Sequence, residues 1–295
     1  MKVILNGYLI NFLKLLIGSC NYFSYKTQIF RFINYMFIDS HIHLDKFVDD
    51  GILDKIIKNA EQNNVQKMIS IGGSDDANLL SINLSQKYPN IIYASAGYDR
   101  DICEFEYCEN NLKNQISSEY VVGVGETGLD YFHSDKNKNQ QIELFSLNLE
   151  LAYQFNKPVI VHSRNAFSDT LNLLKKYSSK VNRFLGVLHC FTLDLEAAKK
   201  LIDLGMMISF SGIVTFKNAS DLRRIVSFIP DEYLLIETDA PYLSPEPMRG
   251  KQNEPAFITH TARQIAELRG CSLENIAKIT SYNAKRLFSI KYKFQ

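Results

Sequence analysis

From Met36 onward the sequence alternates short apolar runs with longer amphipathic segments, and this alternation constrains the fold more than any other feature. The apolar runs are rich in Val, Ile and Leu, as expected for strands that are buried on both faces of a parallel sheet. We expect eight strands, which should end within a few residues of Asp39, Ile71, Ala96, Gly125, Val161, Leu188, Phe210 and Ile236. The segments between the runs repeat apolar residues at helical spacing, as Ile142, Phe145, Leu149 and Ala152 do, which predicts helices with one face on a core.

Eight strand–helix units within about 250 residues are typical of a (β/α)₈ barrel, the TIM barrel. An open doubly wound sheet is the alternative architecture, because it is built from the same units. No internal repeat, low-complexity tract or Gly/Ser linker interrupts the pattern, so residues 36–295 are predicted to form one domain. Residues 273–288 are expected to form a terminal helix that covers the barrel.

Residues 1–35 differ in composition from the rest of the chain. They contain four basic residues and no acidic one, and their apolar run at 3–18 is interrupted by Asn6, Asn11 and Lys14. Such an interrupted run is a poor candidate for a membrane span. Two interpretations remain: a targeting or membrane-surface segment, or an extension upstream of a start at Met36. We expect the segment to lie outside the barrel, without firm membrane association.

The charge and the cysteine content set limits on partners and compartment. The formal net charge is +1, so any contact with nucleic acid must come from a local basic patch and not from a global field. The five cysteines are odd in number and show no Cys-x-x-Cys spacing, which favours free thiols in a reducing cytosol over disulfides or a structural zinc site. The protein is therefore predicted to be cytoplasmic, and nothing in the sequence implies a stable protein partner.

Four of the six histidines stand at predicted strand ends, and two carboxylates occupy the same kind of position on other strands. These six residues are His41, His43, Glu126, His162, His189 and Asp239. In a (β/α)₈ barrel the carboxyl ends of all strands meet at the face that carries the active site, so these distant residues are expected to converge. The remaining histidines, His133 and His260, are expected to be ordinary surface or loop residues.

Imidazole and carboxylate together are ligands for zinc, manganese, iron or nickel, and the strand period puts His41 and His43 on one face. Four histidines and two carboxylates exceed the needs of one tetrahedral ion. Two ions about 3.5–4 Å apart, with Glu126 as a bridge, would use them better. Each element alone has a plainer explanation, such as a chance His-x-His pair, a helix N-cap carboxylate or a core histidine. Their joint occurrence at strand ends favours a metal centre.

The segments around these residues resemble the motifs of the TatD family of magnesium-type deoxyribonucleases. FIDSHIHLD at 37–45 is similar to the family's opening motif, and GETGLDY at 125–131 is similar to its second. The later motifs follow in the family's order: PVIVHSR at 158–164, LHCF at 188–191, SFSG at 209–212, ETDAPYL at 237–243, RGKQNEP at 249–255 and NAKRLF at 283–288. The resemblance covers residues 36–288.

The resemblance implies an amidohydrolase-type barrel with two divalent metal ions, Mg²⁺, Mn²⁺ or Zn²⁺. The ligand sets that it implies are His41, His43, Glu126 and Asp239 for one ion, and Glu126, His162 and His189 for the other. One segment departs from the family, which commonly has Gly-x-His-Pro after the third strand, whereas this chain reads Gly97-Tyr98-Asp99-Arg100. A histidine that is a candidate substrate contact is therefore missing. The departure leaves the metal ligands intact and the substrate preference open.

The function that follows is a hydrolase acting on ester bonds, and more specifically a deoxyribonuclease of the 3′–5′ exonuclease type that acts on single-stranded or frayed DNA ends. In the expected mechanism, two divalent ions activate a water molecule that attacks a phosphodiester in line. Asp239 is the candidate for accepting the proton of this water, and Glu126 is the residue shared by both ions. Arg164, Arg249 and Lys251 are candidates for the local positive patch, because Arg suits bidentate phosphate recognition.

Two other functions remain open at this point. Amidohydrolase- or deacylase-type hydrolysis of a C–N or ester bond, including an aminoacyl-tRNA ester, would use the same barrel and metal type. A metal-binding interaction module is the non-enzyme alternative, although a complete ligand set argues against it. Cys190 beside His189 could suggest a thiol nucleophile, but a buried packing cysteine is expected, since a metal centre already supplies a nucleophile.

Overall fold

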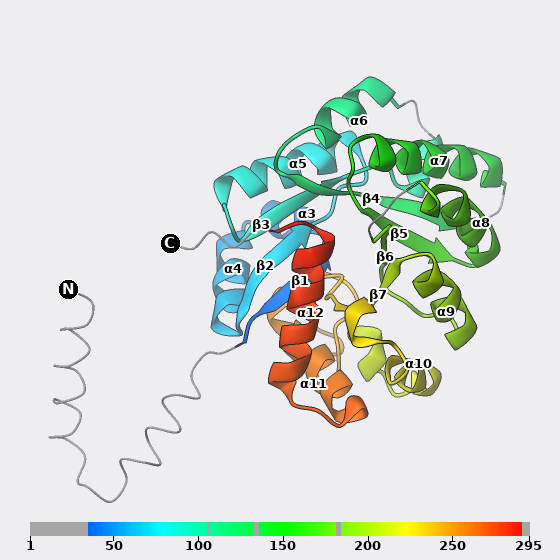
Figure 1. Cartoon of the computed structure of the whole chain (residues 1–295). Coiled ribbons are helices and arrows are strands. Elements are labelled where there is room, and N and C mark those ends of the chain that lie inside the picture. The colour runs from blue at the N-terminus through cyan, green and yellow to red at the C-terminus, as the bar shows by residue number, and fades with distance from the viewer. Residues whose placement is uncertain (1–34, 105–106, 133–135, 181–183, 291–295) are drawn as a thin grey trace, which may run out of the picture. The chain divides into compact units, whose positions relative to one another are not determined.

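The computed structural model describes residues 35–104, 107–132, 136–180 and 184–290. Eight parallel strands form one sheet, and each strand pairs with the next one along the chain (Figure 1). The strands are β1 (Phe37–Ile42), β2 (Val65–Ser70), β3 (Ile92–Ala96), β4 (Val121–Asp130), β5 (Val159–Arg164), β6 (Gly186–Leu188), β7 (Met206–Phe210) and β8 (Leu234–Ile236). This sequential parallel order is the topology of a (β/α)₈ barrel.

Backbone hydrogen bonds between the segments that end β1 and follow β8 close the barrel. The N–H of Asp239 donates to the carbonyl of His41 at 3.0 Å, and the N–H of His43 donates to the carbonyl of Ala240 at 2.9 Å. The predicted (β/α)₈ barrel is confirmed. The doubly wound alternative is excluded, because an open sheet of that kind leaves both of its edges unpaired.

Helices surround the sheet and connect its successive strands (Figure 1). The α-helices are α3 (Asp45–Asp49), α4 (Leu53–Gln62), α5 (Asp75–Lys87), α6 (Glu109–Ile116), α7 (Lys138–Gln154), α8 (Phe167–Ser178), α9 (Leu195–Asp203), α10 (Ser220–Val226), α11 (Ile258–Arg269) and α12 (Leu273–Leu287). Short 3₁₀ turns are η1 (Arg100–Glu104), η2 (Gly212–Thr215), η3 (Asp231–Tyr233) and η4 (Pro255–Phe257). Ser74, Asp194 and Ser272 cap α5, α9 and α12, because each side chain accepts a hydrogen bond from a backbone N–H in the first turn.

Three strands are longer than the sequence pattern predicts. β1 continues to Ile42, β4 to Asp130 and β5 to Arg164, whereas the predicted ends are Asp39, Gly125 and Val161. The predicted ends of the other five strands agree with the structure within one residue. The extensions are mostly polar and carry no strand signal. They persist because β1 stays paired with β2 as far as Ile42, and because the β4–β5 pairing runs on to the last residue of both strands. His41, Glu126 and His162 therefore lie within strands and not after them.

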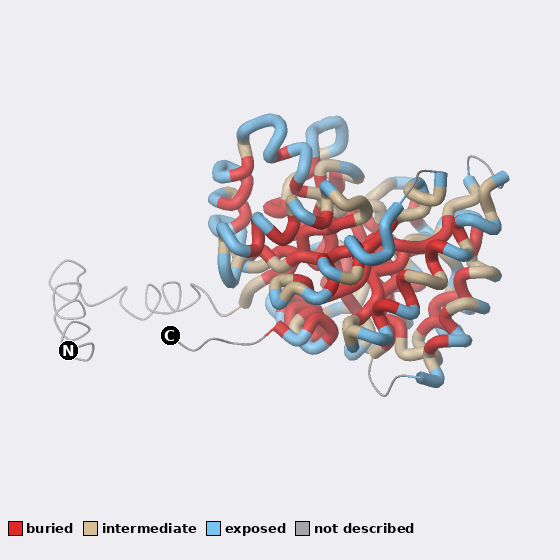
Figure 2. The backbone as a smooth tube through the Cα atoms, turned by 90° about the horizontal axis from the view of Figure 1, so that it is seen from above, coloured by how far each residue is buried: buried red, intermediate tan, exposed pale blue. Residues whose placement is uncertain are grey.

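The terminal helix α12 packs over the amino ends of the strands, as predicted. Phe288, just after the helix, joins a buried cluster that takes one apolar residue from each of six strands: Ile38, Ile69, Ile160, Val187, Met207 and Leu235. The Asn283 amide donates to the carbonyl of Leu234, at the first residue of β8. Figure 2 shows buried residues along the strands and the inner helix faces, with exposed residues on the outer turns. The carboxyl ends of the strands are left for the functional site.

The chain divides by its contacts after Tyr35, and Met36–Gln295 forms one compact unit. The predicted extension at 1–35 lies outside the described residues, apart from its last residue, so its role stays a prediction. Among the residues that the structure describes, no helix is both long enough and apolar enough to cross a bilayer.

A protein that begins at Met36 is expected to fold and to bind metal as the full chain does, because the described barrel needs no strand or helix from residues 1–34. Thermal unfolding and metal content of both proteins, measured side by side, test this expectation. Aggregation of the shorter protein, or loss of its metal, would show that the segment is structural.

Candidate metal centre

All six residues expected to bind metal lie together at the carboxyl ends of the strands. His41 and Glu126 lie in β1 and β4, His162 lies in β5, and His189 directly follows β6. His43 and Asp239 lie just beyond β1 and β8. His41 and Asp239 are almost two hundred residues apart in sequence, and they meet because the barrel closes between β1 and β8.

Four side chains form the first ligand group. The Nε2 atom of His41 lies 3.3 Å from Nε2 of His43, 3.3 Å from Oε2 of Glu126 and 3.7 Å from Oδ1 of Asp239. Nε2 of His43 lies 3.4 Å from the same Asp239 oxygen and 3.6 Å from the same Glu126 oxygen. The two imidazole nitrogens and the Asp239 oxygen form a triangle whose centre lies about 2.0 Å from each corner, a normal length for a bond from zinc to nitrogen or oxygen.

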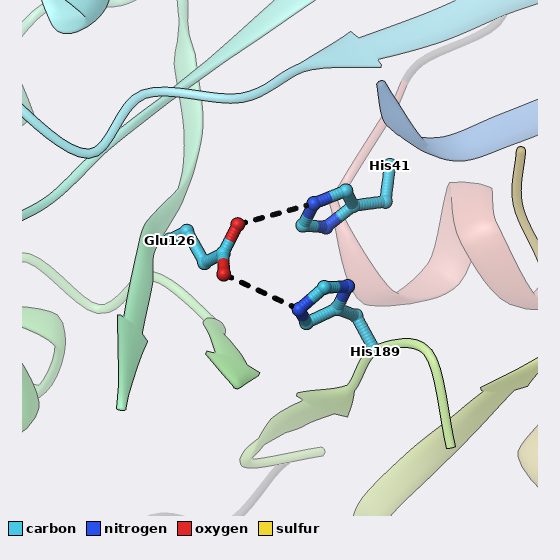
Figure 3. Close-up of side chains that lie close together, drawn as sticks. All are labelled: His41, Glu126 and His189. Atoms are coloured by element: carbon cyan, nitrogen blue, oxygen red, sulfur yellow. Dashed lines mark ion pairs between the residues drawn. The ribbon is translucent and has the colours of Figure 1, made fainter. Parts of the chain in front are cut away.

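Three side chains form a second group around the other oxygen of Glu126. Its Oε1 atom lies 3.4 Å from Nδ1 of His162 and 3.4 Å from Nε2 of His189. The two imidazole nitrogens are also 3.4 Å apart. The centre of such a triangle lies about 2.0 Å from each corner, again a metal–ligand distance. Figure 3 shows the Glu126 carboxylate between His41 and His189, with one oxygen directed toward each imidazole.

Glycines on both sides of Glu126 let β4 come close to β5. A Cβ atom at Gly125 would lie 2.5 Å from the carbonyl oxygen of Ile160, and one at Gly128 would lie 2.0 Å from that of His162. Both glycines also have positive φ angles, +148° and +142°, which other residues rarely adopt. The GETG motif therefore places the Glu126 carboxylate beside the His162 imidazole through close backbone packing.

Burial and pairing together set the charges of the centre. Burial disfavours the charge of Glu126, but the imidazoles of His189 and His41 hold the pKa of its carboxyl well below the usual range. Burial also opposes a charge on His43 and His189, yet neighbouring carboxylates, Asp239 for His43 and Glu126 for His189, raise the pKa of both imidazoles. Without metal, the carboxylates thus attract protons onto the imidazoles of His43 and His189. A divalent cation supplies the same positive charge and replaces those protons, so these residues fit a metal site.

Two acidic residues support the imidazoles from behind, and the sequence analysis gave them no role. Asp130 Oδ2 lies 2.9 Å from Nε2 of His162, and Glu237 Oε1 lies 3.5 Å from Nδ1 of His189. Carboxylates in this position fix the orientation of metal-binding imidazoles. The strand period of two offered a signal for Asp130, since it stands four residues after Glu126 and hence on the same face of β4. For Glu237, two residues before Asp239, no sequence signal pointed to His189.

Arg100, in the segment that departs from the family pattern, also belongs to the centre. Its Nη1 atom donates to Glu126 Oε1 at 3.0 Å and to Asp99 Oδ2 at 2.5 Å. Its Nε atom lies 3.8 Å from Asp130 Oδ2. The sequence motif indicates a missing histidine at this place, but no sequence signal predicts that an arginine reaches the shared carboxylate.

A cavity of about 650 Å³ opens over the centre. Of the three basic residues expected to contact substrate, one lines this cavity and two do not. Arg164 lines this cavity, and its guanidinium carbon lies 3.5 Å from the centre of the Phe132 ring. Arg249 and Lys251 are not among the lining residues. The Arg249 guanidinium instead donates to the carbonyl of Ser244 at 3.1 Å. Of the three, only Arg164 is positioned to meet a ligand in the cavity, and the role expected for Arg249 and Lys251 stays a prediction.

The sequence analysis also predicts that Cys190 is a packing residue and that His260 and His133 are ordinary surface or loop residues. Burial raises the pKa of the Cys190 thiol well above its usual value, and its Sγ lies 3.4 Å from the hydroxyl of Ser211. A thiol that stays protonated is a poor nucleophile, which agrees with a packing role. His260 lies in α11, away from the metal centre, and His133 lies outside the described residues.

The chain is similar to known proteins over almost the whole length of the barrel. The family model described as TatD related DNase matches residues 38–289. The Escherichia coli protein named uncharacterized metal-dependent hydrolase YcfH is 39% identical over 256 residues, which cover 86% of this chain and 96% of that protein. Bacillus subtilis YabD, with the same description, is 37% identical, and the match covers 86% and 100%. The crystal structure of the Escherichia coli TatD homologue YJJV is similar with a TM-score of 0.78 at 29% identity, covering 86% of this chain and 98% of that one.

The buried carboxyl group of Asp39 makes the stability of the metal-free protein depend on pH. This carboxyl is fully buried beside the centre and accepts a hydrogen bond from the backbone N–H of Thr238 at 2.9 Å. Burial raises its pKa from 3.8 to about 7, although hydrogen bonds from Thr238 act in the opposite direction. Between these two values the folded protein binds more protons at Asp39 than the unfolded chain, so stability falls as pH rises through this window.

The variant Asp39→Asn is expected to lose this contribution to the pH dependence of the unfolding free energy. The contribution can reach about 1.4 kcal/mol per pH unit. The measurement is urea unfolding of chelator-treated protein at several pH values between 4 and 8, with the exposed Asp203 replaced by Asn as the matched control. Parallel stability curves for wild type and Asp39→Asn would contradict the assignment.

Proposed function

Because the chain belongs to the TatD-related DNase family and is a metal-dependent hydrolase, we propose that it cleaves phosphodiester bonds of DNA with two divalent metal ions. The proposed substrate is a single-stranded or frayed DNA end, which is degraded from 3′ to 5′. The proposed compartment is the cytoplasm, because all four cysteines in the described part of the chain are free thiols.

The position of Glu126 is the observation that carries this proposal. Its two carboxylate oxygens face two different groups of ligands, with neighbour distances of 3.3–3.6 Å on one side and 3.4 Å on the other. One ion needs only one of these groups. A carboxylate shared by two groups is the arrangement that two-metal hydrolases use to hold ions about 3.5–4 Å apart.

Divalent ions bound there would lower the pKa of a water molecule and polarise the phosphoryl oxygen. The chain's own residues do the rest. Asp239, whose pKa His43 holds below the usual range despite burial, is ionised at neutral pH and can accept the water proton. Arg164 lines the cavity from the end of β5 and can donate to the phosphate as negative charge develops on it. Asp130 keeps the imidazole of His162 in place, and the Glu237 carboxylate, 3.5 Å away, stabilises positive charge on the imidazole of His189.

The test of this function is a substrate panel on the full-length protein with Mg²⁺, Mn²⁺ and Zn²⁺. Single-stranded DNA labelled at either end is compared with a chromogenic phosphodiester, an amide and a carboxylic ester. We expect metal-dependent release of nucleotides from the 3′ end, and no release in chelator. Efficient cleavage of the amide or the ester without cleavage of DNA would replace this function by the amidohydrolase or deacylase alternative.

Glu126→Gln and Glu126→Ala are expected to lose at least one metal ion and to reduce DNA hydrolysis by about a thousandfold, since activation of water by the metal centre contributes several kcal/mol. Folding should persist, because side chains at this end of the barrel serve catalysis more than stability. Metal analysis, thermal unfolding and hydrolysis are measured on each variant.

The matched control is Glu150→Gln, which alters an exposed glutamate on α7. It should leave metal content and hydrolysis unchanged. Full metal content and near-normal hydrolysis in Glu126→Gln would rule out the two-metal proposal, whatever the substrate is.

A further inference from the structure

The segment Gly97-Tyr98-Asp99-Arg100 is held rigidly between β3 and η1. The backbone N–H of Asp99 donates to the carbonyl of Gly73 at 2.8 Å. The amide of Asn148 on α7 bonds the backbone of Tyr98 twice, accepting from its N–H at 3.0 Å and donating to its carbonyl at 3.1 Å. Arg100 therefore leaves a fixed backbone, and its side chain reaches the metal centre from a defined direction.

Two carboxylates hold one edge of the Arg100 guanidinium. Its Nη1 atom bonds both Asp99 and the Oε1 atom of Glu126, while the backbone N–H of Arg100 donates to the other Asp99 oxygen at 2.7 Å. Asp99 thus clamps the arginine at both its backbone and its side chain. Such pairing pre-organises a planar group that loses little further freedom when it binds a ligand.

The Nη2 atom of the guanidinium is available to a ligand, while Nε faces Asp130 at 3.8 Å. Among the described residues, no side chain or backbone group accepts a hydrogen bond from Nη2 of Arg100, which carries two N–H donors. Arg100 lines the same cavity as Arg164. Since β3 and β5 are the two neighbours of β4, these arginines flank Glu126 on opposite sides. The cavity is therefore lined by two arginines, one from the segment after β3 and one from the end of β5.

We propose that Arg100 is a specificity-determining residue that binds a phosphate group of the substrate through Nη2, while Asp99 and Glu126 hold Nη1. This inference rests on the proposed function, because it names the group of a phosphate-containing substrate that the site recognises. A guanidinium keeps its charge throughout the physiological pH range and donates to phosphate oxygens in a fixed plane, as an imidazole in this position would not. The phosphate is either the terminal monoester of a nucleotide or the internal diester of a strand.

The experiment measures binding by calorimetry in Mg²⁺, on the full-length protein, and needs no turnover. Thymidine monophosphate represents the terminal monoester, and a thymidine dinucleotide with a non-hydrolysable phosphonate link represents the internal group. Arg100→Gln should weaken binding of at least one probe by about tenfold to a hundredfold, the usual effect of losing a charge-assisted hydrogen bond. Arg100→Lys, which keeps the charge without the planar fork, should recover binding in part.

Metal affinity separates this role from a structural one. Removal of a cation beside Glu126 should leave the Mg²⁺ affinity unchanged or raise it, because a like charge near the site is lost. The control is Arg224→Gln, which alters an arginine that is 82% exposed on α10 and should change nothing. Asp99→Ala should weaken binding of the same probe as Arg100→Gln does, since the arginine then loses its clamp.

Each outcome decides the proposal. Weaker binding of the monophosphate alone assigns Arg100 to the terminal phosphate, and weaker binding of the dinucleotide alone assigns it to the internal one. Wild-type affinity of Arg100→Gln for both probes overturns the proposal, as does a wild-type protein that binds neither. A protein that binds nucleotide through Arg100 but cleaves no DNA would instead refute the proposed function and leave this inference standing.

Discussion

The arrangement of the functional site depends on the pairing of one buried carboxylate. Glu126 lies 5% exposed at the carboxyl end of β4, where an unpaired charge would cost several kcal/mol. Its partners come from separate parts of the barrel: His41 from β1, His162 from β5, His189 after β6 and Arg100 after β3. The charge is compensated only when all these elements are in place, so the site requires the complete barrel.

The first ligand group also lies on the seam where the barrel closes. His41 and His43 offer their imidazoles to the centre, and their backbone groups make the hydrogen bonds to Asp239 and Ala240 that join β1 to the segment after β8. Asp39 on the same strand accepts hydrogen bonds from Thr238 across this seam. A metal ion held by these side chains would therefore tie together the first and last strands, which are the farthest apart in sequence.

The distribution of charge explains how a nearly neutral protein can be suited to an anionic substrate. The net charge of +1 provides no long-range attraction, and the centre itself is rich in carboxylates. Positive charge at the cavity comes instead from Arg100 and Arg164, on the two sides of Glu126, together with the metal ions that the ligand groups fit. The acids around Arg100 contact its Nη1 and Nε atoms, so Nη1 can hold the site together while Nη2 binds a ligand.

The barrel, its eight strands and the six residues that meet at its carboxyl end could all be predicted from the amino-acid sequence. This was possible because strand and helix periodicities are local, and because the topology alone brings strand ends to one face. The folded structure was needed to show which oxygen of Glu126 faces which imidazoles and how Asp130 and Glu237 lie behind them. It also showed that Arg100 reaches the cavity, whereas Arg249 and Lys251 do not line it. These are relations between side chains on different elements, set by register, by the close packing of β4 on β5 at Gly125 and Gly128, and by loop conformation, and none of these is written in a local pattern.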